Sequence, residues 1–399
     1  MLPRVKISYL NGQLGSVAES PDGLVALVVG SAAVDGKYEL GKAYHIRSTD
    51  DLETLGLTEE NNAQLVKTLK EFYGEADSGT EVVLFGVEPT KTATEVLDYT
   101  NKDGARKVIE SEGGRLRGVI VANLNTGVKK GDAFNPNADV STALEKAQEL
   151  GDWSTETLEA PIFVLLEGRG YTAGKEVPDL SKSRYNRVGV LIGDTVAGSN
   201  GAAMGVLAGR IAMTPVQRNI GRVKTGALAP ITMYVGEKKA EEATSEIADL
   251  YDKGYITPRT HVGRSGYFFT DDRLAVAETD DYAHLALRRV IDKAYRVAYN
   301  TMLDELLDEI EVNEDGTMQP AVVKSWEQTV ENALSSEMTR NGELCATSSA
   351  PEGGVCYIDD KQNVVSTGKV KATIKVNPYG YGRMIDVDLG FNISQGNRQ

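Results

Sequence analysis

The 399-residue sequence has few cysteines, histidines and tryptophans, and fewer basic than acidic side chains. Lysine and arginine total 43 against 58 aspartates and glutamates, a formal net charge of −15. A nucleic acid or an anionic membrane would need a basic surface, so this balance argues against both partners. No apolar run reaches the roughly 18 residues of a transmembrane helix. The opening MLPRVKISYLNGQLG also lacks the apolar core and cleavage site of a signal peptide, so we expect no membrane insertion.

Histidine and cysteine are too scattered for the usual catalytic and metal sites. His45, His261 and His284 show no paired ligand spacing for zinc, and no Gly-x-Ser-x-Gly elbow is present. Cys345 and Cys356 allow a disulfide that closes a local loop, whereas two thiols in a long acidic chain are typical of a cytosolic protein. That pairing stays open. We expect no enzyme activity, no metal and no cofactor.

Glycine-rich turns after apolar runs are the main support for a competing hypothesis, an α/β enzyme that binds a nucleotide or a phosphorylated substrate. The stretch LLEGRGYTAGKE (165–176) departs from a phosphate loop, because Gly168 lies one residue too far from Gly174 and Glu176 replaces the hydroxyl residue. A carboxylate there would repel phosphate. Gly201, Gly205 and Gly209 recur every four residues, which favours close packing of a helix against a neighbour.

Apolar runs alternate with helical patterns through the first part of the chain. Expected strands cover 23–30, 81–87, 117–124, 160–168 and 187–194. Between them we expect a helix capped by Thr58 and ending near Gly74, a short helix over 141–151, and a small-residue helix over 202–213. This alternation predicts an α/β body with a largely parallel or mixed sheet.

The remaining chain predicts two helices and strands at both ends. Apolar residues keep helical spacing from Leu287 to Ile310, and a second helix runs from Pro320 to Gly342. Alternation predicts a strand over 370–376, a terminal strand carrying Ile385, Val387, Leu389 and Phe391, and an opening strand carrying Val5, Ile7 and Tyr9. We therefore divide the chain into an N-terminal strand arm (1–22), an α/β body (23–342) and a C-terminal β segment with a strand arm (343–399).

Two acidic stretches remain. Thr279 is expected to cap a helix with Asp280 and Asp281 in its first turn, while Asp271 and Asp272 suit the preceding turn. His284 then lies in the capped turn, and a metal or catalytic role for it is the less favoured interpretation. The run from Asp304 to Asp315 has no calcium-loop spacing and is expected to be a solvated face.

Several long segments resemble contractile tail sheath proteins. GLVALVVGSAAVDGKYELGKAYHIRSTDDLETLGL (23–57) is similar to the family's opening strand and turn, and the helix ending in Phe72 and Tyr73 before EVVLFGV fits the same order. LYDKGYITPRTHVGRSGYFFTDDRLA, YAHLALRRVIDKAYRVAYNTML and VVKSWEQTVENAL resemble later family segments. VKATIKVNPYGYGRMIDVDLGFNIS resembles the C-terminal strand pair. The chain departs from larger relatives in lacking a large inserted outer domain, which suits a small prophage, a phage-like particle or an injection system.

The resemblance implies a structural subunit that polymerises helically around an inner tube and contracts to drive the tube into a target cell. Implied partners are further copies of the chain, the tube protein, and baseplate and tail terminator proteins, in a virion tail or phage-like particle assembled in the bacterial cytoplasm. Terminal strands with little sheet of their own expose backbone groups that a neighbouring copy can cover by strand addition; pairing of both ends within one chain is the alternative. Asp304, Glu305, Asp308 and Glu309 are the candidate residues facing the tube.

Overall fold

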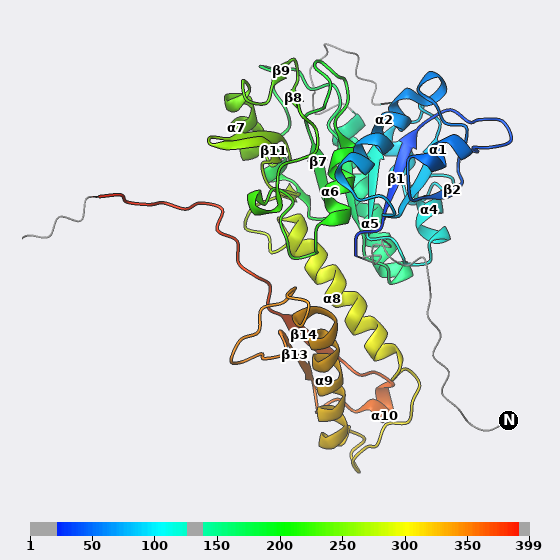
Figure 1. Ribbon diagram of the computed structural model, residues 1–399. Coiled ribbons are helices and arrows are strands. Elements are labelled where there is room, and N and C mark those ends of the chain that lie inside the picture. Colours follow the sequence, from blue (N-terminus) through cyan, green and yellow to red (C-terminus); the bar gives the residue numbers. More distant parts are fainter. Residues whose placement is uncertain (1–21, 126–138, 391–399) are drawn as a thin grey trace, which may run out of the picture.

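Six strands form the central sheet of the α/β body, drawn in Figure 1. The computed structural model describes residues 22–125 and 139–390. In spatial order the strands are β2 (Ala43–Ile46), β3 (Val82–Val87), β1 (Val25–Gly30), β4 (Gly118–Ala122), β5 (Phe163–Glu167) and β7 (Val188–Leu191). All neighbours are parallel except β2, which pairs antiparallel with β3 at one edge. The expected α/β fold with a mixed sheet is therefore confirmed.

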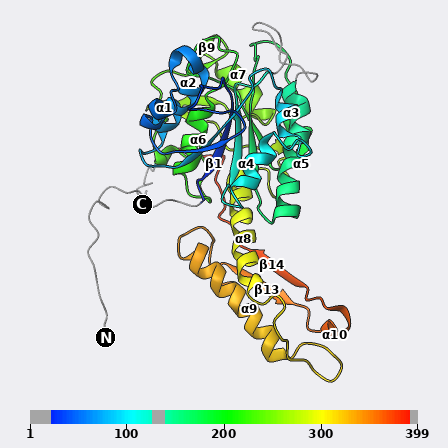
Figure 2. The same cartoon turned by 90° about the vertical axis from the view of Figure 1, so that its right-hand side faces the viewer.

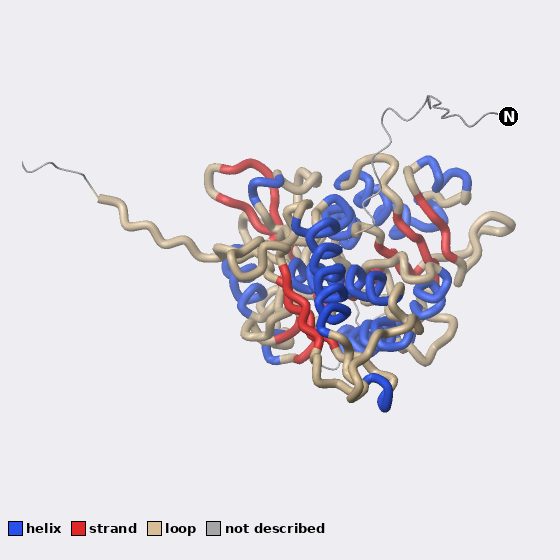
Figure 3. Tube along the Cα trace, turned by 90° about the horizontal axis from the view of Figure 1, so that it is seen from below, coloured by secondary structure: helices blue, strands red, loops and turns tan. Residues whose placement is uncertain are grey.

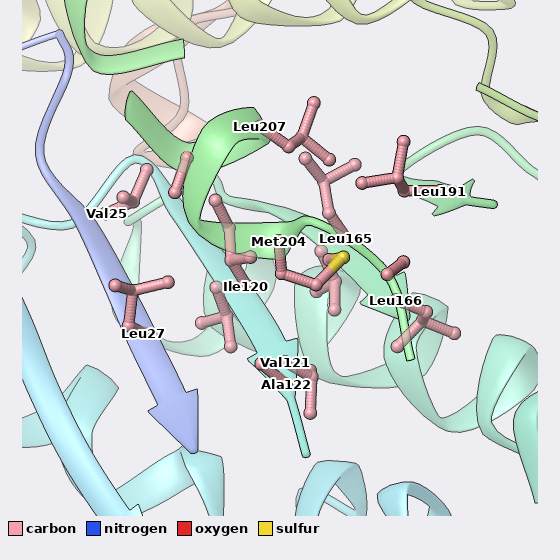
Figure 4. Close-up of a cluster of buried hydrophobic side chains, with 14 of the residues drawn as sticks. Val25, Leu27, Ile120, Val121, Ala122, Leu165, Leu166, Leu191, Met204 and Leu207 are labelled. Carbon is pink, nitrogen blue, oxygen red and sulfur yellow. The ribbon is translucent and has the colours of Figure 1, made fainter. Parts of the chain in front are cut away.

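Helices cover both faces of this sheet, which explains why its inner strands are uninterrupted apolar runs. Every residue of β1, β3 and β4 is buried. The helices of the body are α1 (Asp50–Thr54), α2 (Glu59–Glu75), α3 (Ala93–Leu97), α4 (Ala105–Ser111), α5 (Asp139–Leu158), α6 (Met204–Met213) and α7 (Thr244–Asp252). Helices α2 and α6 lie on one face, and α3 and α5 on the other (Figure 2). Figure 4 shows Met204 and Leu207 of α6 beside apolar side chains of β1, β4 and β5.

Two glycines of α6 allow it to touch α2. A Cβ atom on Gly205 would lie 2.0 Å from the carbonyl oxygen of Thr68, and one on Gly209 would lie 2.6 Å from that of Phe72. No real Cβ fits at such distances, so both positions need glycine for close packing. The expected close approach of this small-residue helix is confirmed. The predicted cap of α2 is also confirmed, because the Thr58 side chain accepts from the Asn61 backbone N–H.

The body also contains short two-stranded pairs and 3₁₀ turns outside the central sheet. The pairs are β6 (Arg184–Tyr185) with β12 (Ala275–Val276), β8 (Tyr234–Val235) with β9 (Lys238–Lys239), and β10 (Pro258–His261) with β11 (Arg264–Phe269). Two 3₁₀ turns cover Leu180–Lys182 and Val223–Thr225.

One long helix, α8 (Leu285–Leu303), connects the body to a second unit, which lies below the body in Figure 1. It contains α9 (Pro320–Leu334), which continues as a π-helical turn over Ser335–Thr339, the hairpin β13 (Gly354–Ile358) and β14 (Ala372–Val376), and α10 (Val364–Thr367). Figure 3 shows α9 lying along the two strands. This unit has its own core, drawn from α8, α9 and β13, in which Val290, Val330 and Ile358 are buried.

The second core contains residues on both sides of the expected boundary at 342–343, since Leu334 and Met338 precede it and Leu344 and Cys356 follow it. The division into body and C-terminal segment stays a prediction. Pro320 at the first position of α9 is confirmed.

Two expected helices have different limits in the structure. Helix α8 ends at Leu303, so Leu306 and Ile310 lie beyond it, because Leu307 adopts a left-handed backbone (φ 69°) that cannot continue the helix. The start at Thr279 is also wrong: α8 begins at Leu285, with His284 as its N-cap residue. Helix α5 is longer than expected and passes through Gly151, where a Cβ would lie 2.8 Å from the Arg187 side chain.

Candidate assembly surfaces

The hairpin β13–β14 has one protected edge and one open edge. Its antiparallel register pairs Cys356 with Ile374 and Ile358 with Ala372. Backbone bonds from Asn377 to Gly353 and from Asp359 to Lys371 lie at the two ends of the ladder, so the hydrogen-bonded pairs fall on odd-numbered residues. The N–H groups of the even-numbered residues therefore point away from the partner strand.

On β13 the outward N–H groups of Cys356 and Ile358 are already used. Glu331 accepts from the N–H of Cys356 and Glu327 accepts from the N–H of Ile358, both at 2.9 Å. Two carboxylates of α9 thus cover the outer edge of β13, as natural sheets often protect an edge. Sequence reasoning missed both residues, because an exposed helix face usually explains glutamates at this spacing.

On β14 no such cover exists among the described residues. The outward N–H groups belong to Ala372, Ile374 and Val376, and the strand pairs with β13 alone. The side chains alternate between half-buried and exposed along the strand. This edge has the geometry that accepts one further strand.

An apolar groove of about 470 Å³ runs between α8 and β14. Its lining is almost entirely apolar and aromatic: Ile291, Ala294, Tyr295, Ala298, Tyr299, Met302, Leu303, Leu306, Ile374 and Val376. Several of these side chains are exposed, including Leu306 at 66%. A strand added to β14 would place every second side chain over this groove, because successive side chains point to opposite faces.

The predicted arm residues divide into described and undescribed ones. Val5, Ile7, Tyr9 and Phe391 lie outside the described residues. Ile385, Val387 and Leu389 are exposed and belong to an extended segment that forms no strand with the described part of the chain. This segment leaves the molecule as the red trace of Figure 1.

The four acidic residues expected to face a tube lie just after α8, at the end of the second unit. Asp304, Asp308 and Glu309 are exposed and Glu305 is half-buried. Leu306 and Leu307, between them, are also exposed. The structure gives none of these four carboxylates an ion pair within the described residues. They form an acidic surface interrupted by apolar side chains.

The carboxyl end of the parallel sheet, where open α/β folds bind ligands, is filled by the chain itself. Asn123 donates through its side chain to the carbonyl of Gly30 (2.7 Å), between β1 and β4, where the strand order reverses. Glu167, at the end of β5, accepts from the backbone N–H groups of Asn123 (2.7 Å) and Ala202 (3.0 Å). The Glu167 carboxylate therefore already takes up backbone N–H groups that a nucleotide phosphate would need at this end of the sheet. This geometry disfavours the nucleotide-binding alternative.

Buried ion pairs fix the first described residue, Asp22, to α8. Its carboxylate lies 2.7 Å from Lys293 and 3.5 Å from Arg296 of α8. Burial raises the pKa of Asp22, but the hydrogen bond from Lys293 and the charges of Lys293, Arg296 and Arg117 outweigh burial and lower it. Lys293 also contacts Glu343 at 2.6 Å, so the same lysine holds the start of the body and the loop after α9.

A second buried cluster precedes α8. Within the part of the chain that the structure describes, Asp271, Asp272 and His284 alone bring three potential metal ligands within 4.8 Å. Asp272 accepts from the backbone N–H of Ala286 (2.8 Å) and from His284 Nδ1 (3.0 Å), and therefore supplies the cap that was expected from Thr279. The antiparallel bridge between Arg273 and His284 brings this distant carboxylate to the helix.

Donors of the chain satisfy all four oxygens of these two carboxylates. Asn219 donates to both carboxylates, Arg383 Nε lies 3.0 Å from Asp271, and the hydroxyl of Tyr251 lies 3.4 Å from the same oxygen. Burial lowers the pKa of His284, but Asp271 and Asp272 outweigh it and raise that pKa. The arrangement is that of an internal ion-pair network. No local pattern pointed to Arg383, because it lies 112 positions from Asp271.

The two cysteines do not change the description of the buried cluster as an ion-pair network. Cys345 is half-buried and Cys356 is buried, and both are free thiols in the structure. None of the described helices has the length and apolar character needed to span a bilayer.

Comparison with solved structures relates the whole fold to two assemblies. A chain in the cryo-EM structure of the anti-feeding prophage baseplate superposes with a TM-score of 0.65 at 14% identity, covering 98% of this chain and 99% of that one. A chain of the extracellular contractile injection system PVC sheath complex in the contracted state gives 0.60 at 14% identity, covering 99% of both chains. A baseplate chain of the same prophage in its contracted state gives 0.62 at 13% identity. At such identities the likeness establishes the fold.

None of the curated proteins matches the sequence. Two family models match it almost end to end: DUF2586, N-terminal domain, over residues 2–273, and DUF2586, C-terminal domain, over residues 281–396. The junction between them falls just before α8, where the second unit begins. The chain therefore belongs to the DUF2586 family.

Proposed function

We propose that this chain is a structural subunit of a contractile sheath, which polymerises helically around an inner tube and contracts to drive the tube into a target cell. The observation that carries the proposal is the whole-chain fold match to chains of the anti-feeding prophage baseplate and the PVC sheath complex, which covers at least 98% of this chain and 99% of each of those chains. The filled end of the sheet makes a nucleotide-dependent enzyme the weaker alternative.

The joint between copies is proposed to be strand addition at β14. A terminal arm of a neighbouring copy would hydrogen-bond to the outward backbone groups of Ala372, Ile374 and Val376. Its apolar face, built from Val5, Ile7 and Tyr9 or from Ile385, Val387, Leu389 and Phe391, would cover the groove between α8 and β14. Donor and acceptor surfaces differ, so the contact is head-to-tail and propagates as a helix.

Electron microscopy tests the sheath proposal directly. Concentrated full-length protein, alone and with the tube protein of its own gene neighbourhood, is expected to form hollow helical polymers in negative stain. Deleting residues 1–12 or 383–399 should leave the body folded by circular dichroism and abolish those polymers. Strictly single particles in every salt, with and without the tube protein, would overturn the proposal.

The groove gives a prediction with a matched control. Leu306→Glu is expected to weaken the joint between copies about 10- to 100-fold, because burying a leucine contributes about 1.5–3 kcal/mol and a charge would replace it. Leu306 lines the groove, whereas Leu307 is 97% exposed and does not. Leu307→Glu should therefore assemble like the wild type in sedimentation assays, and equal defects in the two variants would contradict the assignment.

The acidic surface after α8 is proposed to face the inner tube. Neutralising Asp304, Glu305, Asp308 and Glu309 to the corresponding amides should reduce co-sedimentation with the tube protein, most clearly at low salt because exposed charges are screened. Polymerisation of the chain alone should persist. Unchanged co-sedimentation at low salt would remove these residues from the tube interface.

The remaining assignments follow from the same proposal. Residues 1–22 would serve as an arm, 23–342 as the sheath body and 343–399 as the C-terminal β segment and second arm. Baseplate and tail terminator proteins would contact the two ends of the polymer, in a phage tail or phage-like particle assembled in the bacterial cytoplasm.

A further inference from the structure

The C-terminal segment is attached to the body at one charged point. After β14 the chain crosses back towards the body, where the Tyr381 hydroxyl donates to the carbonyl of Gln217 (2.6 Å) and Arg383 enters the Asp271–Asp272 pair. Arg383 is the last described residue for which the structure gives a hydrogen bond or ion pair, and everything described beyond it is exposed. The contacts of Tyr381 and Arg383 therefore determine where the segment leaves the molecule.

The recognition is specific for a guanidinium group. Arg383 Nε lies 3.0 Å from Asp271 Oδ2 and its Nη2 lies 3.9 Å from Asp272 Oδ1, so one planar group spans two carboxylates. Arg383 also lies over the Tyr381 ring, 5.3 Å from its centre. The Arg383 side chain is 26% exposed, whereas the carboxylates are almost fully buried. A guanidinium can therefore leave while its acceptors stay in place.

His284 contacts the same two carboxylates from the interior. Its Nδ1 lies 3.0 Å from Asp272 Oδ1 and 3.6 Å from Asp271 Oδ1. A protonated His284 and Arg383 therefore neutralise the same pair of negative charges. Each cation lowers the attraction of the pair for the other, since like charges close to one site repel.

We propose that Asp271, Asp272 and His284 form a guanidinium-binding site that holds the root of the C-terminal segment through Arg383, and that protonation of His284 opposes this binding. By reciprocity, bound Arg383 makes His284 release its proton more readily, and a proton on His284 makes Arg383 easier to release. Acid therefore favours release of the segment and alkali favours its attachment.

The other charged groups around the site do not reverse this direction. The titratable and charged side chains that face it are Tyr251 of α7, Arg273 and Glu278 beside the turn, Arg289 of α8, and Tyr381 of the segment itself. The tyrosines have raised pKa values and stay neutral where histidine titrates. The pKa of Asp272 is raised by burial and by Asp271, and protonation of this carboxylate in acid also weakens the hold on Arg383.

The consequence for the surface is local. Tyr379, Tyr381 and Arg383 form one wall of a cleft of about 1010 Å³ whose other walls include α7 and residues 217–223. Release of the segment would open this cleft to solvent and free the chain from residue 378 onwards to point elsewhere.

Histidine titration in the full-length chain tests the inference, because the protein has only three histidines. ¹³C-labelled histidine signals would be followed against pH under conditions in which gel filtration gives a single chain, and His45→Gln and His261→Gln assign them. Arg383→Met should raise the pH at which His284 is half protonated, because it removes a positive charge that opposes the proton. Arg383→Lys keeps the charge but not the planar group that spans both carboxylates, so its midpoint should lie between those of the wild type and Arg383→Met.

Arg259→Met is the matched control, since Arg259 lines the same cleft but has no ion pair with Asp271. Its His284 midpoint should equal that of the wild type. An identical midpoint in wild type, Arg383→Met and Arg259→Met would overturn the coupling.

Chymotrypsin cleavage after Tyr381 measures release itself. The cleavage rate of the wild type, divided by that of Arg383→Met at each pH, should rise as the pH falls, by at most about tenfold per pH unit for one coupled proton. A ratio that does not vary with pH would overturn the inference. Neither measurement depends on the proposed sheath function, since a chain that never polymerises would still show both effects.

Discussion

Replacing Ala372 by proline should strongly weaken helical assembly and leave the chain folded. Proline removes the outward N–H of Ala372 and places a ring on the open edge of β14, where an added strand would have to lie. The substitution spares the hairpin, because the N–H that is lost does not bond to β13. With every joint weakened by at least about 1.4 kcal/mol, the critical concentration for polymerisation should rise tenfold or more. Sedimentation and negative-stain microscopy measure this rise.

Two companion variants separate the edge from the fold. Ala372→Ser keeps the N–H and should polymerise like the wild type. Thr373→Pro removes an N–H that faces β13, so it should lower the melting temperature as well as assembly. Polymers of normal yield from Ala372→Pro would show that β14 does not accept the joining strand.

Asp292→Asn should cost about 3–5 kcal/mol of unfolding free energy, the largest stability loss that we expect from one substitution in α8. The side chain of Asp292 is 4% exposed and accepts from Arg288 (2.7 Å) and from Arg187 (3.2 Å), just before β7. Its neutralisation leaves two buried guanidinium groups without their shared counter-charge. Since Arg187 belongs to the body and Asp292 to α8, the loss should loosen the attachment of the second unit.

Asp152→Asn is the matched control. Asp152 also contacts Arg187, at 3.1 Å, but its side chain is 46% exposed. Water screens a carboxylate that is this exposed, so its attraction to Arg187 should contribute about 1 kcal/mol or less, and this variant should unfold near the wild-type urea concentration. If the two variants lose the same stability in urea titrations, the buried network does not hold α8 in place.

The elements that sequence patterns predicted correctly are those whose signal is local. The buried strands of the central sheet, the Thr58 cap and the glycine contact between α6 and α2 depend on residues close together in the chain. Strand β13 was missed although it alternates, with Gly354, Cys356 and Ile358 buried and Val355 and Tyr357 exposed. The period of two is weak in hydrophobicity, because the buried face includes a glycine and a cysteine whereas apolar Val355 and Tyr357 are exposed.

The features that could not be predicted depend on partners far away in the chain. The cap of α8 comes from Asp272 through a β-bridge, so the local preference for Thr279 was overridden. Gly151 lies inside α5 instead of ending it. The missing side chain leaves room for Arg187 beside the helix. Four charged residues of α8, Arg288, Arg289, Asp292 and Lys293, lie buried or nearly so, and their counter-charges and acceptors lie mostly in other segments. Periodicity identified the helix but not the side that faces other charges.

Glu327 and Glu331, on the outer edge of β13, limit where a copy can accept an added strand. Because they cover that edge, the hairpin of each copy would accept an added strand only at β14, so under the proposed strand addition every copy inside a row has this edge filled by a neighbour. At one tip of the row the edge of β14 would remain open, and at the other tip a terminal arm would remain without an accepting copy. If the proposed joint holds, the two tips would differ chemically, and growth would have a direction that is set by two side chains of α9.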